Sequence, residues 1–350
     1  MEIGVGLDAS LGLSFEEEAV LSRAAAELGY TSLWTPEGAG YDSFQVCAQR
    51  WTASRDVVPE GLTTGISVSP VALRTPMGLA MSAGTVSAIT GGRFILGIGS
   101  GGIYRPSGRR SYGLPKVSSL EVMRDYLVTV RALVAGEAVT YEGQSVNLHE
   151  VKLGIRPAPS TPVYLGALGP KMLRLSGESA DGAALNWCTP EQIAWSRERI
   201  AEGAETAGRD PAVVKMAEYI RVCVDEDTDA ARCAFAKATL GYAMGPKGAT
   251  ATGRALGYRA HFERMGFADT LSRLDGMRDR GASADEMVDA FPVEQLDQVG
   301  YQGPASGAAE AFGRLSKGLD TAIVRVVAAK PGVEHVLATM NACRPELVGV

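Results

Sequence analysis

Short apolar segments alternate with longer amphipathic segments along most of this chain. The apolar segments lack the polar alternation of a sheet with one face in water, which indicates strands buried on both sides. The longer segments repeat apolar residues at helical spacing. The pattern predicts eight strands, each followed by a helix, and therefore an α/β protein of the (β/α)8 TIM-barrel class. The predicted strands are residues 2–7, 31–35, 62–69, 93–98, 163–166, 182–186, 214–224 and 321–327.

The predicted helices carry local start and stop signals. Ser14 at the N-cap and Glu17 three residues later form a capping-box pattern, and Gly29 marks the end of that helix. Residues 138–148 interrupt the rhythm and predict a small hairpin that turns at Glu142-Gly143. The predicted helices are residues 14–28, 43–54, 77–89, 117–134, 171–179, 190–207, 229–243, 305–317 and 333–342.

One region departs from the strand–helix repeat. A glycine-rich segment, residues 245–257, opens a mostly helical stretch, which we interpret as an insertion at residues 245–300 after strand seven of one domain spanning residues 1–350. Long insertions in barrels usually cover the site and exclude water, so we expect a lid. A doubly wound sheet is the alternative fold, although no GxGxxG pattern follows the first strand, where a dinucleotide-binding fold would carry it.

The barrel prediction locates the site before any motif is considered. Active sites of (β/α)8 barrels lie at the C-terminal ends of the strands, so the residues at those ends are the candidates. They are Asp8, Glu37, residues 65–69, residues 99–105, residues 166–171, Asn186, Trp187 and Arg221.

The fourth predicted strand leads into a glycine-rich loop. The sequence Gly-Gly-Arg-Phe-Ile-Leu-Gly-Ile-Gly-Ser-Gly at residues 91–101 ends in Gly99, Ser100 and Gly101. Glycine lets a backbone approach a ligand closely, and such loops hold planar cofactors or phosphates in α/β enzymes. A tight turn between strand and helix is the competing interpretation.

The fifth predicted strand runs directly into a helix through residues 166–172, Gly-Ala-Leu-Gly-Pro-Lys-Met. Gly169 permits a sharp bend and Pro170 suits the first helical position. The bare N–H groups of the first turn, together with the charge of Lys171, favour binding of an anion such as a phosphate. The alternative is an ordinary helix start.

Charged residues at other strand ends suggest further chemistry. Arg105, Arg109 and Arg110 cluster after strand four and indicate either an anionic ligand or a solvated basic loop. Asp8 and Glu37 are the carboxylates closest to the predicted site, where they would orient a ring amide or relay a proton, or else cap a helix. No Ser-His-Asp or Cys-His arrangement can be assembled from the three histidines, so we expect the chemistry to belong to a cofactor.

Composition narrows the classes of protein further. The chain has 350 residues, 46% hydrophobic and 21% charged, as in soluble globular proteins. Its net charge of −6 argues against a nucleic-acid partner, and no apolar run suits a membrane span. Five scattered cysteines and the absence of a basic leader favour a reduced, cytoplasmic location, and no histidine spacing suits a metal.

Several of these segments resemble the luciferase-like monooxygenase superfamily, and within it the branch that uses the deazaflavin coenzyme F420. The resemblance rests on residues 91–101, on strand 64–70 and on residues 162–182, the last being most similar to methylenetetrahydromethanopterin reductases. It spans about residues 1–225 and 303–327.

The resemblance implies a flavin-like ring at the C-terminal ends of the strands. It implies a non-prolyl cis peptide at Gly65-Ile66 or Ile66-Ser67, pressed toward the ring, and a phosphate site over residues 166–172. Many members carry Asp-His after strand two, whereas this chain has Glu37-Gly38, so the histidine of that proton-transfer role is missing. The cofactor-binding residues expected from both arguments are Gly65, Ile66, Ser67, Gly99, Ser100, Gly101, Gly166, Ala167, Leu168, Gly169, Pro170, Lys171 and Met172.

The combined prediction is an F420-dependent oxidoreductase that transfers hydride between the deazaflavin and a small organic substrate. Glu37 and Asp8 are the candidate catalytic residues, and Asn186, Trp187 and Arg105 the candidate substrate contacts. The alternatives are an FMN-dependent monooxygenase and a barrel that binds a flavin without catalysis. Apolar faces on helices 77–89 and 117–134 favour a homodimer.

Overall fold

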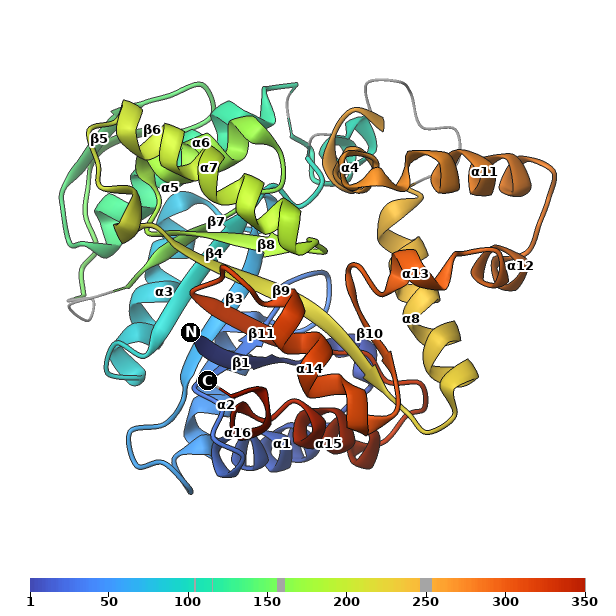
Figure 1. Ribbon diagram of the computed structural model, residues 1–350. Coiled ribbons are helices and arrows are strands. Elements are labelled where there is room, and N and C mark those ends of the chain that lie inside the picture. The colour runs from blue at the N-terminus through green and yellow to red at the C-terminus, as the bar shows by residue number, and fades with distance from the viewer. Residues whose placement is uncertain (104, 115, 156–160, 246–253, 350) are drawn as a thin grey trace.

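A closed barrel of eight parallel strands forms the centre of the molecule in the computed structural model, which describes residues 1–103, 105–114, 116–155, 161–245 and 254–349 (Figure 1). The order around the barrel is β1-β2-β3-β4-β7-β8-β9-β11, and β11 pairs with β1 to close it. The predicted fold class is therefore confirmed. The barrel strands are β1 (Glu2–Gly6), β2 (Ser32–Thr35), β3 (Thr63–Pro70), β4 (Phe94–Gly99), β7 (Val163–Gly166), β8 (Gly182–Asn186), β9 (Lys215–Val224) and β11 (Thr321–Val326).

Helices surround the barrel and fill the insertion. In Figure 1, α8 and α11 to α13 lie together to one side of the strands, with α4 near α11, while helices such as α1, α3 and α14 lie against the strands. The helices are α1 (Phe15–Glu27), α2 (Ser43–Ser54), α3 (Pro76–Ile89), α4 (Pro106–Ser111), α5 (Ser119–Val134), α6 (Pro170–Ser179), α7 (Pro190–Thr206), α8 (Thr228–Ala243), α10 (Gly257–Phe262), α11 (Ala268–Asp279), α12 (Ala284–Asp289), α13 (Val293–Leu296), α14 (Ala305–Leu315), α15 (Val333–Ala342) and α16 (Pro345–Val348). Short 3-10 turns lie at η1 (Ala9–Leu11), η2 (Val71–Leu73) and η3 (Pro211–Val213), and η4 (Glu263–Phe267) is a π-helical turn.

Local signals in the sequence located most elements to within two residues. The capping box of α1 forms as predicted, with the Ser14 hydroxyl accepting from Glu17 N–H and the Glu17 carboxylate accepting from Ser14 N–H. The hairpin of β5 (Val139–Glu142) and β6 (Asn147–Val151) also forms, with a wider turn than predicted.

One strand was missed in the sequence. β10 (Gly300–Gly303) pairs in parallel with the last residues of β9, beyond the point where β9 pairs with β8. It is four residues long and holds two glycines, so it has neither the length nor the apolar run by which a buried strand is recognised.

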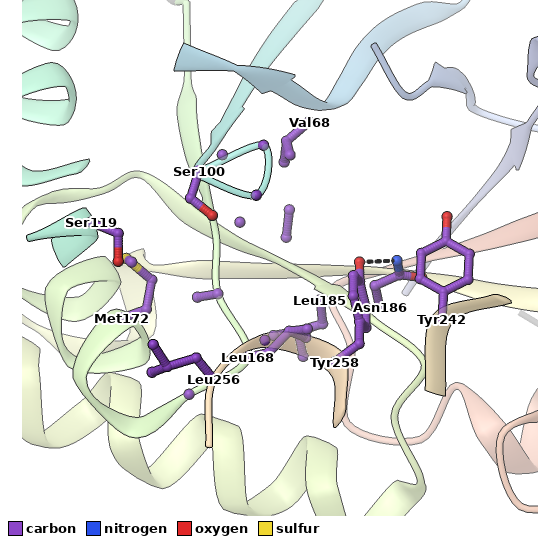
Figure 2. A pocket seen from close by; sticks show the side chains of 18 of the residues that line it. Val68, Ser100, Ser119, Leu168, Met172, Leu185, Asn186, Tyr242, Leu256 and Tyr258 are labelled. Atoms are coloured by element: carbon purple, nitrogen blue, oxygen red, sulfur yellow. Dashed lines mark hydrogen bonds between the residues drawn. The ribbon is translucent and has the colours of Figure 1, made fainter. Parts of the chain in front are cut away.

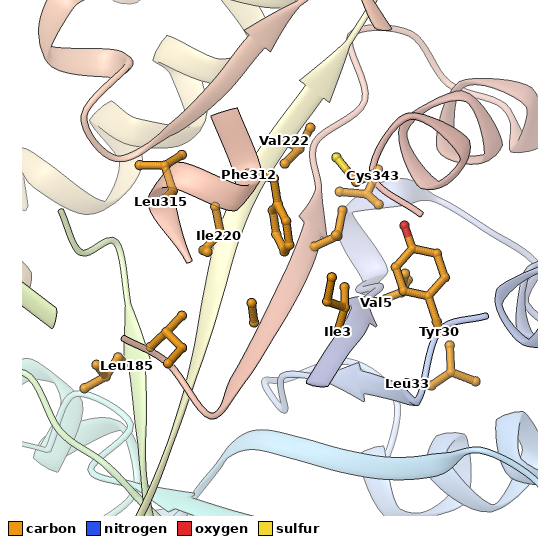
Figure 3. Packing of buried hydrophobic residues seen from close by; sticks show 14 of the residues in the cluster. Ile3, Val5, Tyr30, Leu33, Leu185, Ile220, Val222, Phe312, Leu315 and Cys343 are labelled. Carbon is orange, nitrogen blue, oxygen red and sulfur yellow. The ribbon is translucent and has the colours of Figure 1, made fainter. Parts of the chain in front are cut away.

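Packing between strands and outer helices forms the largest core. Figure 3 shows Ile220 and Val222 of β9 beside Phe312 of α14, and Val5 of β1 beside Tyr30. These side chains are almost fully buried. Burial of such apolar area at about 25 cal/mol per Å² makes this layer the principal stabilising force of the barrel wall.

Large aromatic side chains close the inside of the barrel below the site. Trp34, Tyr164 and Tyr219 pack together there with Ile323. A Cβ at Gly65 would lie 2.4 Å from the Trp34 ring, so that glycine leaves room for the tryptophan. The aromatic layer makes the floor of the barrel solid and confines any ligand to the C-terminal end.

The described residues hold neither a candidate membrane span nor a candidate metal cluster. None of their helices combines the length and apolar character of a membrane span. Within the same ranges, no three histidine, cysteine or acidic side chains gather in an arrangement suited to a metal ion.

Candidate functional site

A cavity of about 710 Å³ lies at the C-terminal ends of the strands, where the barrel prediction put the site (Figure 2). Its walls come from the strand ends, from the loop after β4, from the start of α6 and from the insertion. Of the predicted site residues, those that line it are Glu37, Ser67, Val68, Gly99, Ser100, Gly101, Gly102, Arg105, Gly166, Ala167, Leu168, Gly169, Pro170, Lys171, Met172, Asn186 and Arg221.

One wall of the cavity is made mainly by backbone and by Val68. The pairing of β3 with β4 shifts register between Ile66 and Ser69, and the Val68 side chain stands against neighbouring glycines. A Cβ at Gly99 would lie 2.3 Å from Val68 Cγ2, and one at Gly166 would lie 3.2 Å from Val68 Cγ1. The glycines therefore make room for Val68, which presents a small apolar shelf to the cavity (Figure 2).

The cis peptide lies one bond beyond the predicted place, at Ser67-Val68. The two candidate bonds, Gly65-Ile66 and Ile66-Ser67, were both wrong. Gly65 and Ile66 are fully buried below the shelf, outside the cavity lining, and contact Trp34 and the core behind α2 and α3. The sequence resemblance located the strand and Ser67, which lines the cavity, but not the position of the cis peptide.

The start of α6 forms the second wall and fits an anion. Its N-cap is Gly169, which has no side chain to accept from the first-turn N–H groups, and Pro170 occupies the first position. Residues 166–172 all line the cavity, Lys171 among them. The partial positive charge of an uncapped helix start beside a lysine is suited to a phosphate.

Glu37 lines the cavity but is fully engaged in hydrogen bonds. Arg74 holds both of its oxygens, at 2.6 and 2.8 Å, the Ser69 hydroxyl donates to one and Ser43 N–H to the other. Arg74 also pairs with Asp42 at 2.6 Å. Because its acceptor sites are filled by protein donors, the geometry gives Glu37 the role of fixing the end of β3 to α2.

Asp8 faces a different partner and is not among the lining residues. It pairs with Arg325, which does line the cavity, and it caps η1 by accepting from Ser10 N–H at 2.8 Å. Arg325 is 5% exposed. Asp8 therefore neutralises a buried cation at the mouth of the barrel, an arrangement that explains an acidic residue at this strand end without a proton relay.

The opposite end of the cavity is made by side chains. Arg221 of β9 donates to Asn186 Oδ1 at 2.5 Å. The Asn186 amide donates to the Tyr258 hydroxyl at 2.6 Å, as Figure 2 shows. The Tyr242 ring lies 4.8 Å from the Arg221 guanidinium and packs edge-on against Tyr258. Asn186, predicted from its strand end, thus joins two tyrosines that come from α8 and α10.

Trp187, predicted beside Asn186 as a substrate contact, does not line the cavity. Its ring is fully buried against Phe235 and Phe262, and the Arg221 guanidinium covers it at 3.8 Å. The residue has a positive φ of 59°, which turns its side chain away from the strand direction. Strand-end position alone did not indicate on which side the ring would pack.

Buried polar groups fasten the insertion to the barrel behind this wall. His261 Nε2 donates to the Trp187 carbonyl at 2.8 Å, and Arg264 reaches the Leu168 carbonyl at 2.7 Å. Burial lowers the pKa of His261 to about 4, so the ring is neutral at physiological pH. Cys188 N–H donates to the carboxyl of Glu218 at 2.6 Å, and burial raises the pKa of Glu218 to about 8.

Arg105 and Arg109, which follow β4, line two different cavities. Arg105 lines the main cavity, whereas Arg109 donates to the Ile103 carbonyl at 2.9 Å and lines a second, smaller cavity. The sequence also missed lining residues that are plain once the fold is known: Tyr242, Tyr258, Arg264 and Arg325. Three of them belong to α8 or the insertion, where no strand-end rule applies, and residues 246–253 of the predicted glycine-rich segment lie outside the described residues.

The chain is similar in sequence to reductases and oxidoreductases. It is 30% identical over 213 residues to 5,10-methylenetetrahydromethanopterin reductase of Methanolobus tindarius, a match that covers 61% of this chain and 63% of that enzyme's length. It is 32% identical over 322 residues to a Mycobacterium tuberculosis protein named as a coenzyme F420-dependent oxidoreductase, with 85% and 88% covered.

Solved structures show the same fold. The F420-dependent tetrahydromethanopterin reductase of Methanopyrus kandleri matches with a TM-score of 0.77 at 20% identity, over 98% of this chain and 97% of that one. The oxygenating constituent of 3,6-diketocamphane monooxygenase of Pseudomonas putida, in complex with FMN, matches with a TM-score of 0.68 at 16% identity, over 100% and 99%. The family model of the luciferase-like monooxygenases matches residues 2–320, so this chain belongs to that family.

Proposed function

We propose that this protein is an F420-dependent oxidoreductase that transfers hydride between the deazaflavin and an organic substrate. The observation that carries the proposal is the pairing, in one cavity, of a flat apolar shelf at Val68 with an uncapped, lysine-bearing helix start at α6. The relative named as a coenzyme F420-dependent oxidoreductase supports the choice of cofactor.

The residues of the cavity fit a deazaflavin. Val68 would support one face of the ring, since Gly99 and Gly166 have no side chains and leave room for it. Residues 169–172 and Lys171 would hold the phosphate. A bound reduced deazaflavin supplies a hydride, which the protein has no residue of its own to provide.

The remaining groups of the cavity position the reaction and exclude water. Glu37 holds the end of β3 through Ser69, and Arg74 fixes Glu37 in turn. Leu256, Tyr258 and Tyr242 come from the insertion side and face the barrel end, which supports the proposed lid. A site closed in this way holds the reacting atoms in alignment without water between them.

Equilibrium titrations with F420 and with FMN test the choice of cofactor. We expect F420 to bind with micromolar affinity and to quench tryptophan fluorescence, and we expect FMN to bind at least tenfold more weakly. A preference for FMN would refute the F420 assignment, and binding of neither would refute the reading of α6 as a phosphate site.

A second candidate function is an FMN-dependent monooxygenase. The fold match to an FMN-bound monooxygenase over the full chain favours keeping it. Oxygen consumption with reduced FMN and its absence with reduced F420 would decide for this alternative.

A further inference from the structure

Among the residues that the structure describes, four arginines are buried, three with a carboxylate partner and one without. Arg50, Arg259 and Arg325 pair with Glu18, Asp275 and Asp8 respectively. Arg221 is 4% exposed, and among the described residues no carboxylate lies within ion-pair distance of it. Its partners are the four neutral side chains Asn186, Trp187, Tyr242 and Tyr258, reached directly or through the Asn186 amide.

The strand register makes the charge beside Arg221 positive as well. Arg325 of β11 is the direct parallel neighbour of Arg221 on β9, and both line the cavity. Asp8 supplies one negative charge to these two guanidiniums. The acid nearest along β9, Glu218, points out of the barrel to Cys188 N–H and has a pKa raised by burial to about 8, so it adds little negative charge at neutral pH.

A buried guanidinium without a counterion is costly, and proteins retain one where a ligand supplies the missing charge. The planar fork of arginine matches a carboxylate with two parallel hydrogen bonds. Figure 2 shows Asn186 and Tyr258 at the end of the cavity away from Met172, which stands in the first turn of α6. Arg221 belongs to the Asn186 end, because it donates to Asn186 Oδ1. The apolar Leu168 and Leu185 lie between the two ends, and Leu256 lies near Met172 (Figure 2).

We propose that Arg221 binds the carboxylate of an organic substrate, so that this enzyme acts on organic acids with an apolar body. Asn186 orients the guanidinium, and Tyr258 and Tyr242 form the sides of the carboxylate site. That the bound carboxylate belongs to a substrate rests on the proposed function. The anion site itself rests on the geometry of β8, β9 and the insertion.

The test uses matched pairs of ligands that differ in charge alone. Benzoate against benzamide and hexanoate against hexanamide are titrated into the protein by calorimetry, first without cofactor and then with saturating F420. We expect each carboxylate to bind at least about tenfold more tightly than its amide, as for a hydrogen-bonded pair with a charged group.

Three variants locate the effect. Arg221→Met should abolish the carboxylate preference, and Arg221→Lys should retain part of it because the charge remains without the planar fork. Asn186→Asp is nearly isosteric and supplies the arginine with a carboxylate inside the protein. We therefore expect it to remove carboxylate binding while leaving the melting temperature unchanged or higher, a combination that loss of folding cannot produce.

Lys171→Gln is the control, because it removes a cation from the other end of the same cavity. It should leave the carboxylate preference intact and weaken F420 binding. Equal binding of acids and amides to the wild type would overturn the proposal while leaving F420 binding as an independent result. A loss of F420 affinity in Arg221→Met with the carboxylate preference retained would overturn it in favour of a contact with the cofactor.

Discussion

The two ends of the cavity are built by different means. The end beside Val68 and α6 is shaped by glycines and by backbone N–H groups, and the end beside Arg221 is shaped by hydrogen-bonded side chains from two strands and the insertion. A surface made of backbone serves a ligand whose shape does not vary. A surface made of side chains changes with each substitution, so it is the part that can be adapted to a particular substrate.

The largest effect is expected where a buried ion pair supports the side-chain end. Asp8→Asn leaves Arg325 without a counterion next to Arg221, and we expect a loss of about 3 kcal/mol in the free energy of unfolding. Arg221→Met removes a buried charge that has no such partner, so we expect a change of less than about 1 kcal/mol. Urea denaturation of both variants measures the contrast, and equal losses would show that Arg221 is balanced inside the protein.

The backbone-built end should respond to volume rather than to charge. A methyl group at Gly99 would lie 2.3 Å from Val68 Cγ2, so Gly99→Ala should cost about 2 kcal/mol of stability and weaken F420 binding about tenfold. Adding Val68→Ala should restore part of both. Gly154→Ala is the matched control, since nothing lies within 4 Å of its added methyl group. If Gly99→Ala had no larger effect than Gly154→Ala, the proposal that Val68 supports the cofactor ring would be wrong.

The junction between barrel and insertion predicts a dependence of stability on pH. Glu218 has a folded pKa of about 8 against 4.5 when unfolded, so the folded state holds its proton longer and stability falls as pH rises between these values. His261 has a folded pKa of about 4 against 6.5, so its contribution rises with pH over that range and offsets Glu218 below 6.5.

The two contributions leave a net fall in stability of about 1–2 kcal/mol between pH 6.5 and 8. Glu218→Gln should abolish this fall, and His261→Gln should extend it to lower pH. Denaturation curves at pH 5, 6.5 and 8 measure both. A flat profile for the wild type would contradict the burial of an acid at this junction.

The smallest effect concerns the single cation at the start of α6. Lys171→Gln should weaken F420 binding about fivefold and reduce the dependence of that binding on salt, because one charge contact is lost while the helix N–H groups remain. Titrations at low and high salt measure it. An unchanged affinity at both salt concentrations would mean that the phosphate does not reach this residue.

The same contrast explains what could be predicted from the sequence. The barrel, the α6 site and the shelf strand follow from local patterns: apolar runs, a Gly-Pro-Lys helix start and glycines after a strand. Arg221 and Asn186 were predicted from their positions at strand ends, but the hydrogen bond between them was not. Tyr258 and Tyr242 were not predicted as site residues. The bond from Asn186 to Tyr258 depends on how the insertion folds back onto the barrel, and Tyr242 of α8 joins the site by packing against Tyr258.

The predicted catalytic acids show a further limit of strand-end reasoning. Asp8 and Glu37 occupy the expected positions, yet each is engaged with an arginine that lies far away in sequence, Arg325 and Arg74. The sequence does not distinguish a strand-end carboxylate that faces a ligand from one that pairs with a guanidinium. The partner, which decides its role, is fixed by tertiary packing.

A crystal structure of the protein with F420 bound tests the division of the cavity most directly. The account predicts the deazaflavin ring on Val68, its phosphate on the first turn of α6 beside Lys171, and Arg221 free of contact with the cofactor. A ring or phosphate held by Arg221, or a phosphate placed away from α6, would contradict it.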